Sequence, residues 1–255
     1  MNALFVLEAL IVGILCPVGE AKQDTPASLE NVSKRFQIEI VRIPTKIYPV
    51  KNRFGIITGE VPTEASLKKY TPVLARELSK YPTPFLEKTN LKRIVLAQGL
   101  QYDGQERAGV PDFQNQTLHL DVEQGNWNKL YQESVIHHEL FHVVDWKDDG
   151  KIYDDKKWKK LNPDRFEYGS GGKNARGKDQ WPLDNTLRGF LNKYSMSGVE
   201  EDKAEIYANM IVRPGVVRKR ARKDPVIAKK ITAMKRLLHD FSPSMDRNFW
   251  VGLER

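Results

Sequence analysis

The segment VIHHELFHVVD, residues 135–145, restricts what this chain can be more than any other stretch of it. His138 and His142 are four positions apart, so on a helix their side chains lie on one face, one turn apart. Glu139 follows the first of them and completes the pattern H-E-x-x-H. On a helix this pattern presents two imidazoles to Zn²⁺ and leaves the glutamate free to act on a water molecule. We therefore predict a zinc site on a long helix over residues 126–146.

A catalytic zinc site keeps three protein ligands and one open position, so a third ligand must come from elsewhere. Cys16 is the only cysteine, and it lies in an apolar N-terminal run, so no thiolate ligand is expected. His137 is five positions from His142 and points to another side of the helix. We leave His137 out of the predicted site and look for a carboxylate.

One candidate is Asp148, ten positions beyond His138, the spacing used by zinc peptidases in which the chain turns sharply after the motif. Met196 would then stand for the methionine turn of that class. The turn normally needs a glycine, and Asp145 occupies the turning position here. The helix is therefore expected to continue past this point.

The other candidate lies in SGVEEDKAEIYANMIV, residues 197–212, which we predict to be helical. Ser197 and Glu200 match the S-x-x-E capping box that marks a helix start. An acidic first turn is also what the helix dipole favours, and this alone accounts for Glu200 and Asp202.

Glu201 and Glu205 are four positions apart and share one face of this predicted helix. Glu201 could bind the metal while Glu205 accepts a hydrogen bond from a ligand imidazole. From the residues alone, Asp148 and Glu201 both stay open as the third ligand.

Strands are expected early in the chain and helices later, which predicts an α+β fold. The expected strands are 36–43, 91–100 and 117–122, and the expected helices are 62–82, 126–146, 197–212 and 226–241. Residues 104–116 are typical of a loop, and a long insertion rich in Gly, Lys, Asp and Trp covers 147–196. The strand 117–122 is a candidate to pair with an extended substrate, and His119 on its polar face is expected at the surface.

The N-terminus has the pattern of a removable signal peptide, with a short apolar run and small residues at Gly19 and Ala21. We predict a signal peptide over 1–21, a polar linker over 22–34 and a single domain over 35–255. The protein is thus expected to be secreted or periplasmic, with no stable membrane insertion after signal removal.

The formal net charge is +8, and much of the positive excess lies late in the chain, in VVRKRARKDP and AKKITAMKRLLHD. Such a surface attracts acidic partners. A solvated face of a C-terminal helix explains the same charge. Because no aromatic residues are interleaved with it and no nucleic-acid motif accompanies it, no specific nucleic-acid partner is expected.

HELFHVVD and the later pattern Y-x6-E-x-x-A-E resemble gluzincin-type zinc peptidases related to the catalytic domain of anthrax lethal factor. Residues 117–212 are also similar to bacterial zinc-binding metallopeptidases. The resemblance implies a zincin-like α+β domain, with a small N-terminal sheet, an edge strand over the active-site helix and a helical C-terminal part. It implies these roles: zinc ligands His138, His142 and Glu201, catalytic base Glu139, Tyr194 facing the reacting oxygen, and supporting carboxylates Asp145 and Glu205.

Together these observations predict a zinc metallopeptidase with one zinc ion per chain and a protein or peptide substrate. Glu139 would take the proton of the attacking water, and Tyr194 would stabilise the oxyanion. One alternative is a non-catalytic, zinc-stabilised binding module that uses the basic C-terminal helix; the intact Glu139 argues against it. Another is a zinc amidase acting on a non-protein amide, whose ligands would be the same.

Overall fold

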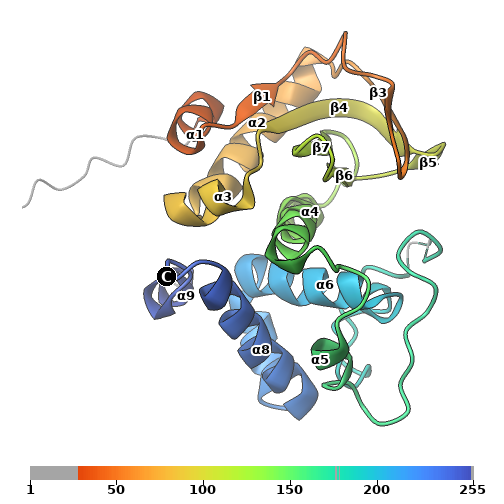
Figure 1. The fold of residues 1–255 in the computed structure, drawn as a ribbon, viewed down its shortest axis with the longest axis vertical. Helices are drawn as coiled ribbons and strands as arrows, with labels where there is room; N and C mark the ends of the chain where they lie inside the picture. The colour runs from red at the N-terminus through yellow and green to blue at the C-terminus, as the bar shows by residue number, and fades with distance from the viewer. Residues whose placement is uncertain (1–27, 176, 178, 254–255) are drawn as a thin grey trace, which may run out of the picture.

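The computed structural model describes residues 28–175, 177 and 179–253. Over these residues the chain forms the predicted α+β fold, with α4 lying between the sheet on one side and α6 on the other (Figure 1). The helices are α1 (Leu29–Phe36), α2 (Glu64–Ser79), α3 (Thr83–Thr89), α4 (Lys129–Asp149), α5 (Lys156–Lys159), α6 (Val199–Val212), α7 (Pro214–Ala221), α8 (Pro225–Phe241) and α9 (Arg247–Gly252), with a 3₁₀ turn, η1 (Tyr194–Met196).

Within the described residues, seven strands form one mixed sheet around β4. The strands are β1 (Glu39–Val41), β2 (Val50–Asn52), β3 (Gly55–Glu60), β4 (Arg93–Tyr102), β5 (Gln105–Glu106), β6 (Gly109–Asp112) and β7 (Thr117–Asp121). β4 pairs in parallel with β1 and β7 and antiparallel with β3 and β5. The order β2-β3-β4-β7-β6 leaves β6 at the edge, where it packs against α4.

β7 is an internal strand, so the proposed substrate pairing at its edge is wrong. It pairs with β4 on one side and β6 on the other, and all its residues are buried. The edge strand is β6, inside the segment 104–116 that we expected to be a loop. Its sequence GVPD is not typical of a strand. Pro111 has no N–H to donate, but an edge strand tolerates proline because one of its sides has no partner strand. His119 is 1% exposed rather than at the surface, and its Nδ1 lies 2.9 Å from the Tyr48 hydroxyl.

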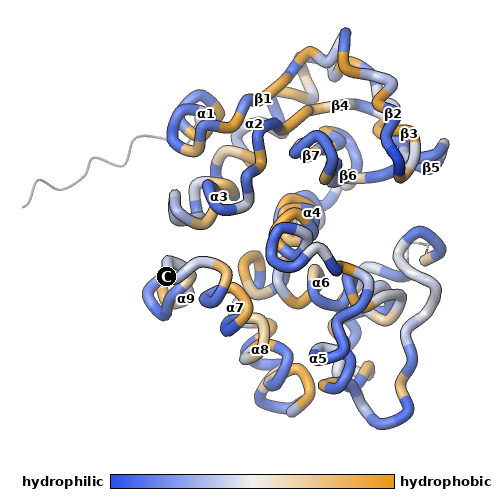
Figure 2. The backbone as a smooth tube through the Cα atoms, viewed as in Figure 1, coloured by the Kyte–Doolittle hydropathy of each residue, from blue (hydrophilic) through white to orange (hydrophobic). Residues whose placement is uncertain are grey.

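Helix α4 starts and ends three residues later than predicted. The Asn128 side chain caps its N-terminus by accepting from the Tyr131 N–H at 3.2 Å. Gly150, with a φ of 73°, ends it in the left-handed conformation that favours glycine. Because α4 lies between the sheet and α6, apolar residues cover several of its sides, and much of its tube is orange in Figure 2.

Helix α6 does not begin with the predicted capping box. Gly198 precedes its first turn, and no side chain caps the free N–H groups. The Ser197 hydroxyl instead donates to the Tyr194 carbonyl oxygen at 2.7 Å, which closes the preceding 3₁₀ turn. The cap was mispredicted because this turn already uses the serine side chain.

The insertion 147–196 has little regular structure, as expected, but buried polar contacts tie it to the helices. The Asp202 carboxylate on α6 accepts hydrogen bonds from Trp158 Nε1 at 2.8 Å, the Tyr168 hydroxyl at 2.5 Å and Lys230 Nζ at 2.7 Å. Asp202 and Lys230 are both fully buried. Asp202 is therefore more than part of an acidic first turn, because it fixes the insertion and α8 to α6.

Lys203 makes a second buried link at the next position. Its Nζ lies 2.5 Å from Asp145 Oδ1 on α4 and 3.1 Å from Asp155 Oδ2 in the insertion. Only 3% of the lysine side chain is exposed, so these two carboxylates, and not water, stabilise its positive charge. Helices α4 and α6 and the insertion are thus joined by paired charges near the predicted metal site.

The structure covers only part of the predicted N-terminal segments. The predicted signal peptide 1–21 lies outside the described residues. Residues 29–34 of the predicted linker 22–34 belong to α1, which Ser28 caps and which buries Leu29, Val32 and Phe36 against the core. No helix in the described ranges is both long and apolar enough to cross a membrane.

Candidate active site

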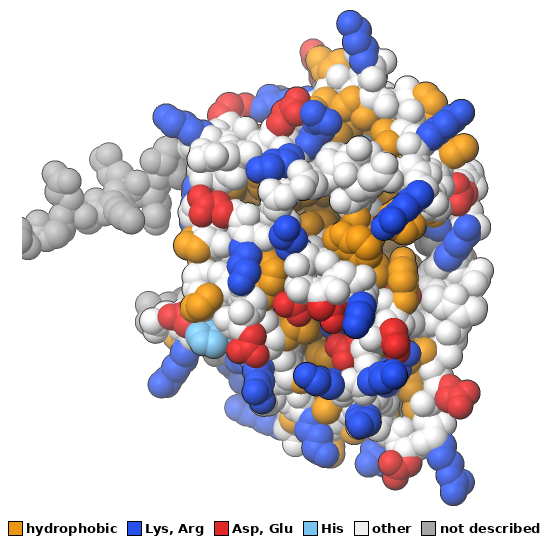
Figure 3. All heavy atoms as spheres, viewed as in Figure 1, with side chains coloured by type: hydrophobic (Ala, Val, Ile, Leu, Met, Phe, Trp, Pro, Cys, Tyr) orange, Lys and Arg blue, Asp and Glu red, His pale blue; other side chains and the backbone are white. Residues whose placement is uncertain are grey.

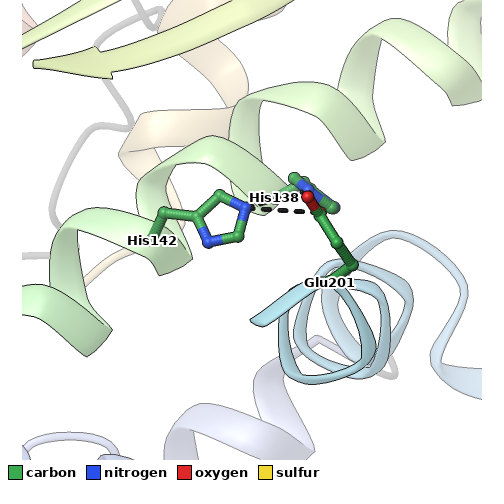
Figure 4. A group of neighbouring side chains, drawn as sticks. All are labelled: His138, His142 and Glu201. Atoms are coloured by element: carbon green, nitrogen blue, oxygen red, sulfur yellow. Dashed lines mark hydrogen bonds and ion pairs between the residues drawn. The ribbon is translucent and has the colours of Figure 1, made fainter. Parts of the chain in front are cut away.

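His138 and His142 on α4 and Glu201 on α6 point toward one another across the two helices (Figure 4). His138 Nε2 lies 2.9 Å from Glu201 Oε2 and 3.1 Å from His142 Nε2. The third edge of the triangle, from His142 Nε2 to Glu201 Oε2, is 3.5 Å. All three residues are buried.

This triangle has the size of a zinc site. Ligand atoms at about 2.0–2.2 Å from Zn²⁺ in tetrahedral geometry lie about 3.4 Å from one another. The three edges, 2.9, 3.1 and 3.5 Å, bracket this separation. Neutral imidazole nitrogens and a carboxylate oxygen all carry lone pairs, so their convergence in a buried site fits a cation between them.

A second carboxylate fixes the orientation of His138. Glu205 Oε1 lies 3.0 Å from His138 Nδ1, so Glu205 holds a proton on Nδ1 and leaves Nε2 as the ring nitrogen that would bind a metal ion. Glu205 is itself held by Asn192 Nδ2 at 2.6 Å and Asn209 Nδ2 at 3.3 Å. The structure therefore places Glu205 in the supporting position that the sequence suggested.

Glu201 is held in its charged form. Burial alone would raise the pKa of Glu201, but hydrogen bonds from His138 and His142 lower this pKa well below its ordinary value. A carboxylate that stays ionised among imidazoles is suited to bind a cation.

Glu139 lies beside this triangle, where the site opens into a cleft of about 1370 Å³. The edge strand passes directly over it: a Cβ added to Gly109 would come within 2.5 Å of Glu139 Cγ. Burial raises the pKa of Glu139, although the nearby His138 and His142 oppose this rise. A carboxylate with increased proton affinity at the floor of a cleft is typical of a general base.

Comparison with known proteins agrees with this arrangement. Residues 37–236 match a protein family described as "Putative zinc-binding metallo-peptidase". This chain belongs to that family. The match runs from before β1 to the middle of α8, so it includes the sheet and both helices of the site.

A solved structure of similar fold comes from Bacteroides caccae, and it is described as that of a putative zinc-binding metallo-peptidase. It shares 20% sequence identity with this chain, covers 88% of this chain and 87% of its own, and gives a TM-score of 0.54. At this identity the likeness shows a common fold. No curated protein matches the chain.

In the present protein, Tyr194 lines the cleft beside the three candidate zinc ligands. Its ring stacks on Trp181 with centroids 3.9 Å apart and lies 5.9 Å from the His138 ring. A Cβ added to Gly172 would come within 2.4 Å of the Tyr194 hydroxyl and 2.0 Å of Glu201 Oε1. The insertion therefore contacts the site at Gly172. The sequence analysis did not identify this residue, although the glycine-rich run GSGGK could have indicated a close approach of the backbone.

Asp145 is placed differently from the expected supporting carboxylate. Its Oδ1 is paired with Lys203, and its Oδ2 has no hydrogen-bond partner among the described residues. His142 Nδ1 likewise lacks a partner among the described residues. The structure therefore does not join Asp145 to a ligand imidazole by a hydrogen bond.

The local candidate for the third ligand is not brought to the triangle. Because α4 continues to its end at Gly150, Asp148 lies in the last turn of the helix, and the described ligand cluster does not include it. His137 points away from the cleft: its Nε2 lies 2.9 Å from Glu77 Oε2, and its Nδ1 lies 2.5 Å from the Tyr81 hydroxyl.

Proposed function

We propose that this protein is a zinc-dependent metallopeptidase of the gluzincin type, in which His138, His142 and Glu201 hold one zinc ion. The observation that carries the proposal is the convergence of three buried ligand atoms beside Glu139, which faces a large cleft. A structural zinc site normally closes with a fourth protein ligand. Among the described residues, this cluster contains three.

Bound zinc would lower the pKa of a water molecule and polarise the substrate carbonyl. Glu139 would accept the proton of the attacking water and pass it to the leaving amine. Glu205 would keep the proton of His138 on Nδ1 throughout. The Tyr194 hydroxyl, which lies against Gly172 next to Glu201, would donate a hydrogen bond to the oxyanion.

The edge strand β6 is suited to hold an extended peptide over Glu139. Asp121 N–H donates to the Ala108 carbonyl at 2.9 Å, and Gly109 is paired in register with Leu120. In an antiparallel pair the hydrogen bonds alternate, so the N–H and C=O of Gly109 face away from β7, toward the free edge. These groups would bind a substrate strand beside the base.

A protein or peptide substrate outside the cytoplasm is part of this proposal, and the pattern of residues 1–21 supports export. Figure 3 shows Lys and Arg side chains spread over the visible face with Asp and Glu among them. This distribution favours an ordinary solvated surface over a binding module that works through one basic patch.

A peptide-library cleavage assay, run with and without a chelator and beside Glu139→Gln, tests the proposal. Zinc-loaded protein should cleave peptides, the chelator should stop cleavage, and Glu139→Gln should keep the metal and lose turnover. Full activity in Glu139→Gln would remove that residue from the role of base. Activity on non-protein amides with none on peptides would favour the amidase alternative.

A further inference from the structure

Apart from Nδ1 of the ligand candidate His142, three buried polar atoms of residues that line the cleft have no hydrogen-bond partner in the described part of the chain. They are Ser134 Oγ on α4, Asn209 Oδ1 on α6 and Nε of Arg213, the residue after α6. All three side chains line the cleft. Nearly all buried polar groups in folded proteins have a hydrogen-bond partner, either protein or ordered water, so these three side chains leave hydrogen-bonding capacity for a ligand that enters the cleft.

The helix packing brings these residues to the same end of the cleft. His138 contacts both Glu201 and Glu205, and His142 contacts Glu201, so α4 and α6 run antiparallel. Ser134 lies one turn before His138, and Asn209 lies one turn after Glu205, so both occupy the next level of this packing. Arg213 follows one turn later. We call these three residues the polar end of the cleft.

The amide of Asn209 is held in one orientation. Its Nδ2 donates to the Glu205 carbonyl oxygen at 2.9 Å and to Glu205 Oε2 at 3.3 Å. Both Glu205 atoms are acceptors, so the amide cannot be flipped, and Oδ1 is the atom without a partner. Asn209 is 3% exposed, so it presents a fixed acceptor in a buried position.

Arg213 supplies a positive charge at the same end. The structure gives its side chain no ion pair or hydrogen bond to the described residues, and its Nε is buried. Glu205, the nearest acid along α6, is already bound to His138, Asn192 and Asn209. A guanidinium without a carboxylate partner among the described residues, in a cleft that a serine hydroxyl also lines, is suited to bind an external carboxylate.

Aromatic side chains form a wall beside the polar end of the cleft. Trp181 from the insertion packs edge-on against Tyr131 with ring centroids 5.6 Å apart and stacks on Tyr194. Pro182 and Leu183 also line the cleft. Apolar walls lower the local dielectric constant and strengthen a charge-assisted hydrogen bond.

We propose that the polar end of the cleft is a subsite for a carboxylate of the substrate peptide, a specificity that rests on the function proposed above. Arg213 and Ser134 would donate to the carboxylate, and Asn209 Oδ1 would accept a peptide N–H close to it. Arg213, just after α6, is twelve residues beyond the metal ligand Glu201, about 18 Å along the helix axis. An extended peptide rises about 3.3 Å per residue, so the carboxylate belongs to a residue roughly five positions from the bond that is cleaved.

Binding to the zinc-loaded Glu139→Gln protein tests this subsite without requiring turnover. The probes are short fluorescent peptides in which one Glu is moved through the sequence, each matched by a Gln peptide and made with a free or an amidated C-terminus. At one position a carboxylate should tighten binding by about tenfold or more. Loss of the preference on amidation would identify a C-terminal carboxylate; dependence on Glu with either end would identify an acidic side chain.

The preference should disappear in Arg213→Gln and weaken in Ser134→Ala, both made in the Glu139→Gln background. Arg222→Gln, which removes an exposed arginine outside the cleft, is the matched control and should retain it. Zinc content and thermal unfolding establish that each variant is folded. In the active enzyme, Arg213→Gln should raise KM for the preferred peptide more than it lowers kcat.

Equal binding of all Glu and Gln peptides, no measurable peptide binding, or a preference that survives Arg213→Gln would overturn the subsite. These outcomes are separate from failure of the proposed function. If the protein binds carboxylate peptides through Arg213 but never cleaves them, the subsite is confirmed and the proposed peptidase function is contradicted.

Discussion

Gly109 on the edge strand and Glu139 on α4 lie in direct contact, and a single added methyl group at Gly109 would come within 2.5 Å of Glu139 Cγ. Gly109, which would bind the substrate backbone, and Glu139, which would accept the proton, therefore hold each other in position. A glycine is required here because of this close approach and not because of its backbone angles.

Gly109→Ala should displace Glu139 while leaving the zinc ligands in place. We expect zinc content to be unchanged and kcat to fall by about tenfold or more, because small displacements of a catalytic group are costly. Steady-state kinetics with a cleaved library peptide measures this. Gly215→Ala is the control, since a Cβ there would meet nothing within 4 Å. Full activity in Gly109→Ala would contradict the assigned contact.

The hydrogen bond between Glu205 and His138 predicts a specific effect on metal affinity. Glu205→Gln should weaken zinc binding by about 10- to 100-fold, because the carboxylate that fixes the ring and increases its basicity is lost. Competition with a chromophoric chelator measures the affinity. Asp145→Asn should change zinc affinity much less, since Asp145 is paired with Lys203. The reverse order would show that Asp145 supports the site instead.

The buried Asp202–Lys230 pair predicts a large loss of stability. Asp202→Asn should lower the free energy of unfolding by about 3–5 kcal/mol, because Lys230 would be left buried without its carboxylate. Urea denaturation measures this, and Asp240→Asn, from an exposed pair with Arg236, should show no measurable change. Similar unfolding midpoints for the two variants would mean that Asp202 does not anchor the insertion.

The lowered pKa of Glu77 predicts how the free energy of unfolding changes at acidic pH. Burial opposes its ionisation, but a hydrogen bond from His137 and the nearby Lys80 lower the pKa of Glu77 from 4.5 to about 2. The folded pKa is below the unfolded one, so its contribution is complete above about pH 4.5 and is lost as pH falls toward 2. It amounts to at most about 3 kcal/mol.

Metal-free wild type and Glu77→Gln should therefore be compared by urea denaturation across this pH window, since zinc release would otherwise add its own pH dependence. Wild type should lose its advantage over the variant as the pH falls. A difference between them that does not change with pH would show that Glu77 has an ordinary pKa.

The helical spacing of the histidines and glutamates allowed the main groups of the site to be predicted from sequence. His138 and His142 are four residues apart on one predicted helix, so their side chains were expected on the same face. The same spacing placed Glu201 and Glu205 on one face of a second predicted helix. What spacing did not establish was that these two helices pack against each other, so Asp148 and Glu201 both remained open. The structure decides between their positions because α4 continues without a turn to Gly150.

Features that depend on distant partners were missed. The edge strand β6 reads as a loop because Gly109 and Pro111 have low strand propensity, and only its place at the sheet edge makes them acceptable. Asp202 and Lys203 look like ordinary residues of a charged helix start. Their partners lie in the insertion, on α4 and on α8, and no local pattern connects them.

The central claim is that His138, His142 and Glu201 bind one zinc ion, and a crystal structure of the zinc-loaded protein tests it most directly. Anomalous scattering at the zinc edge should give a single strong peak about 2.0–2.2 Å from the Nε2 atoms of both histidines and a carboxylate oxygen of Glu201. Absence of a peak there, or a peak bound by Asp148 instead of Glu201, would contradict the account.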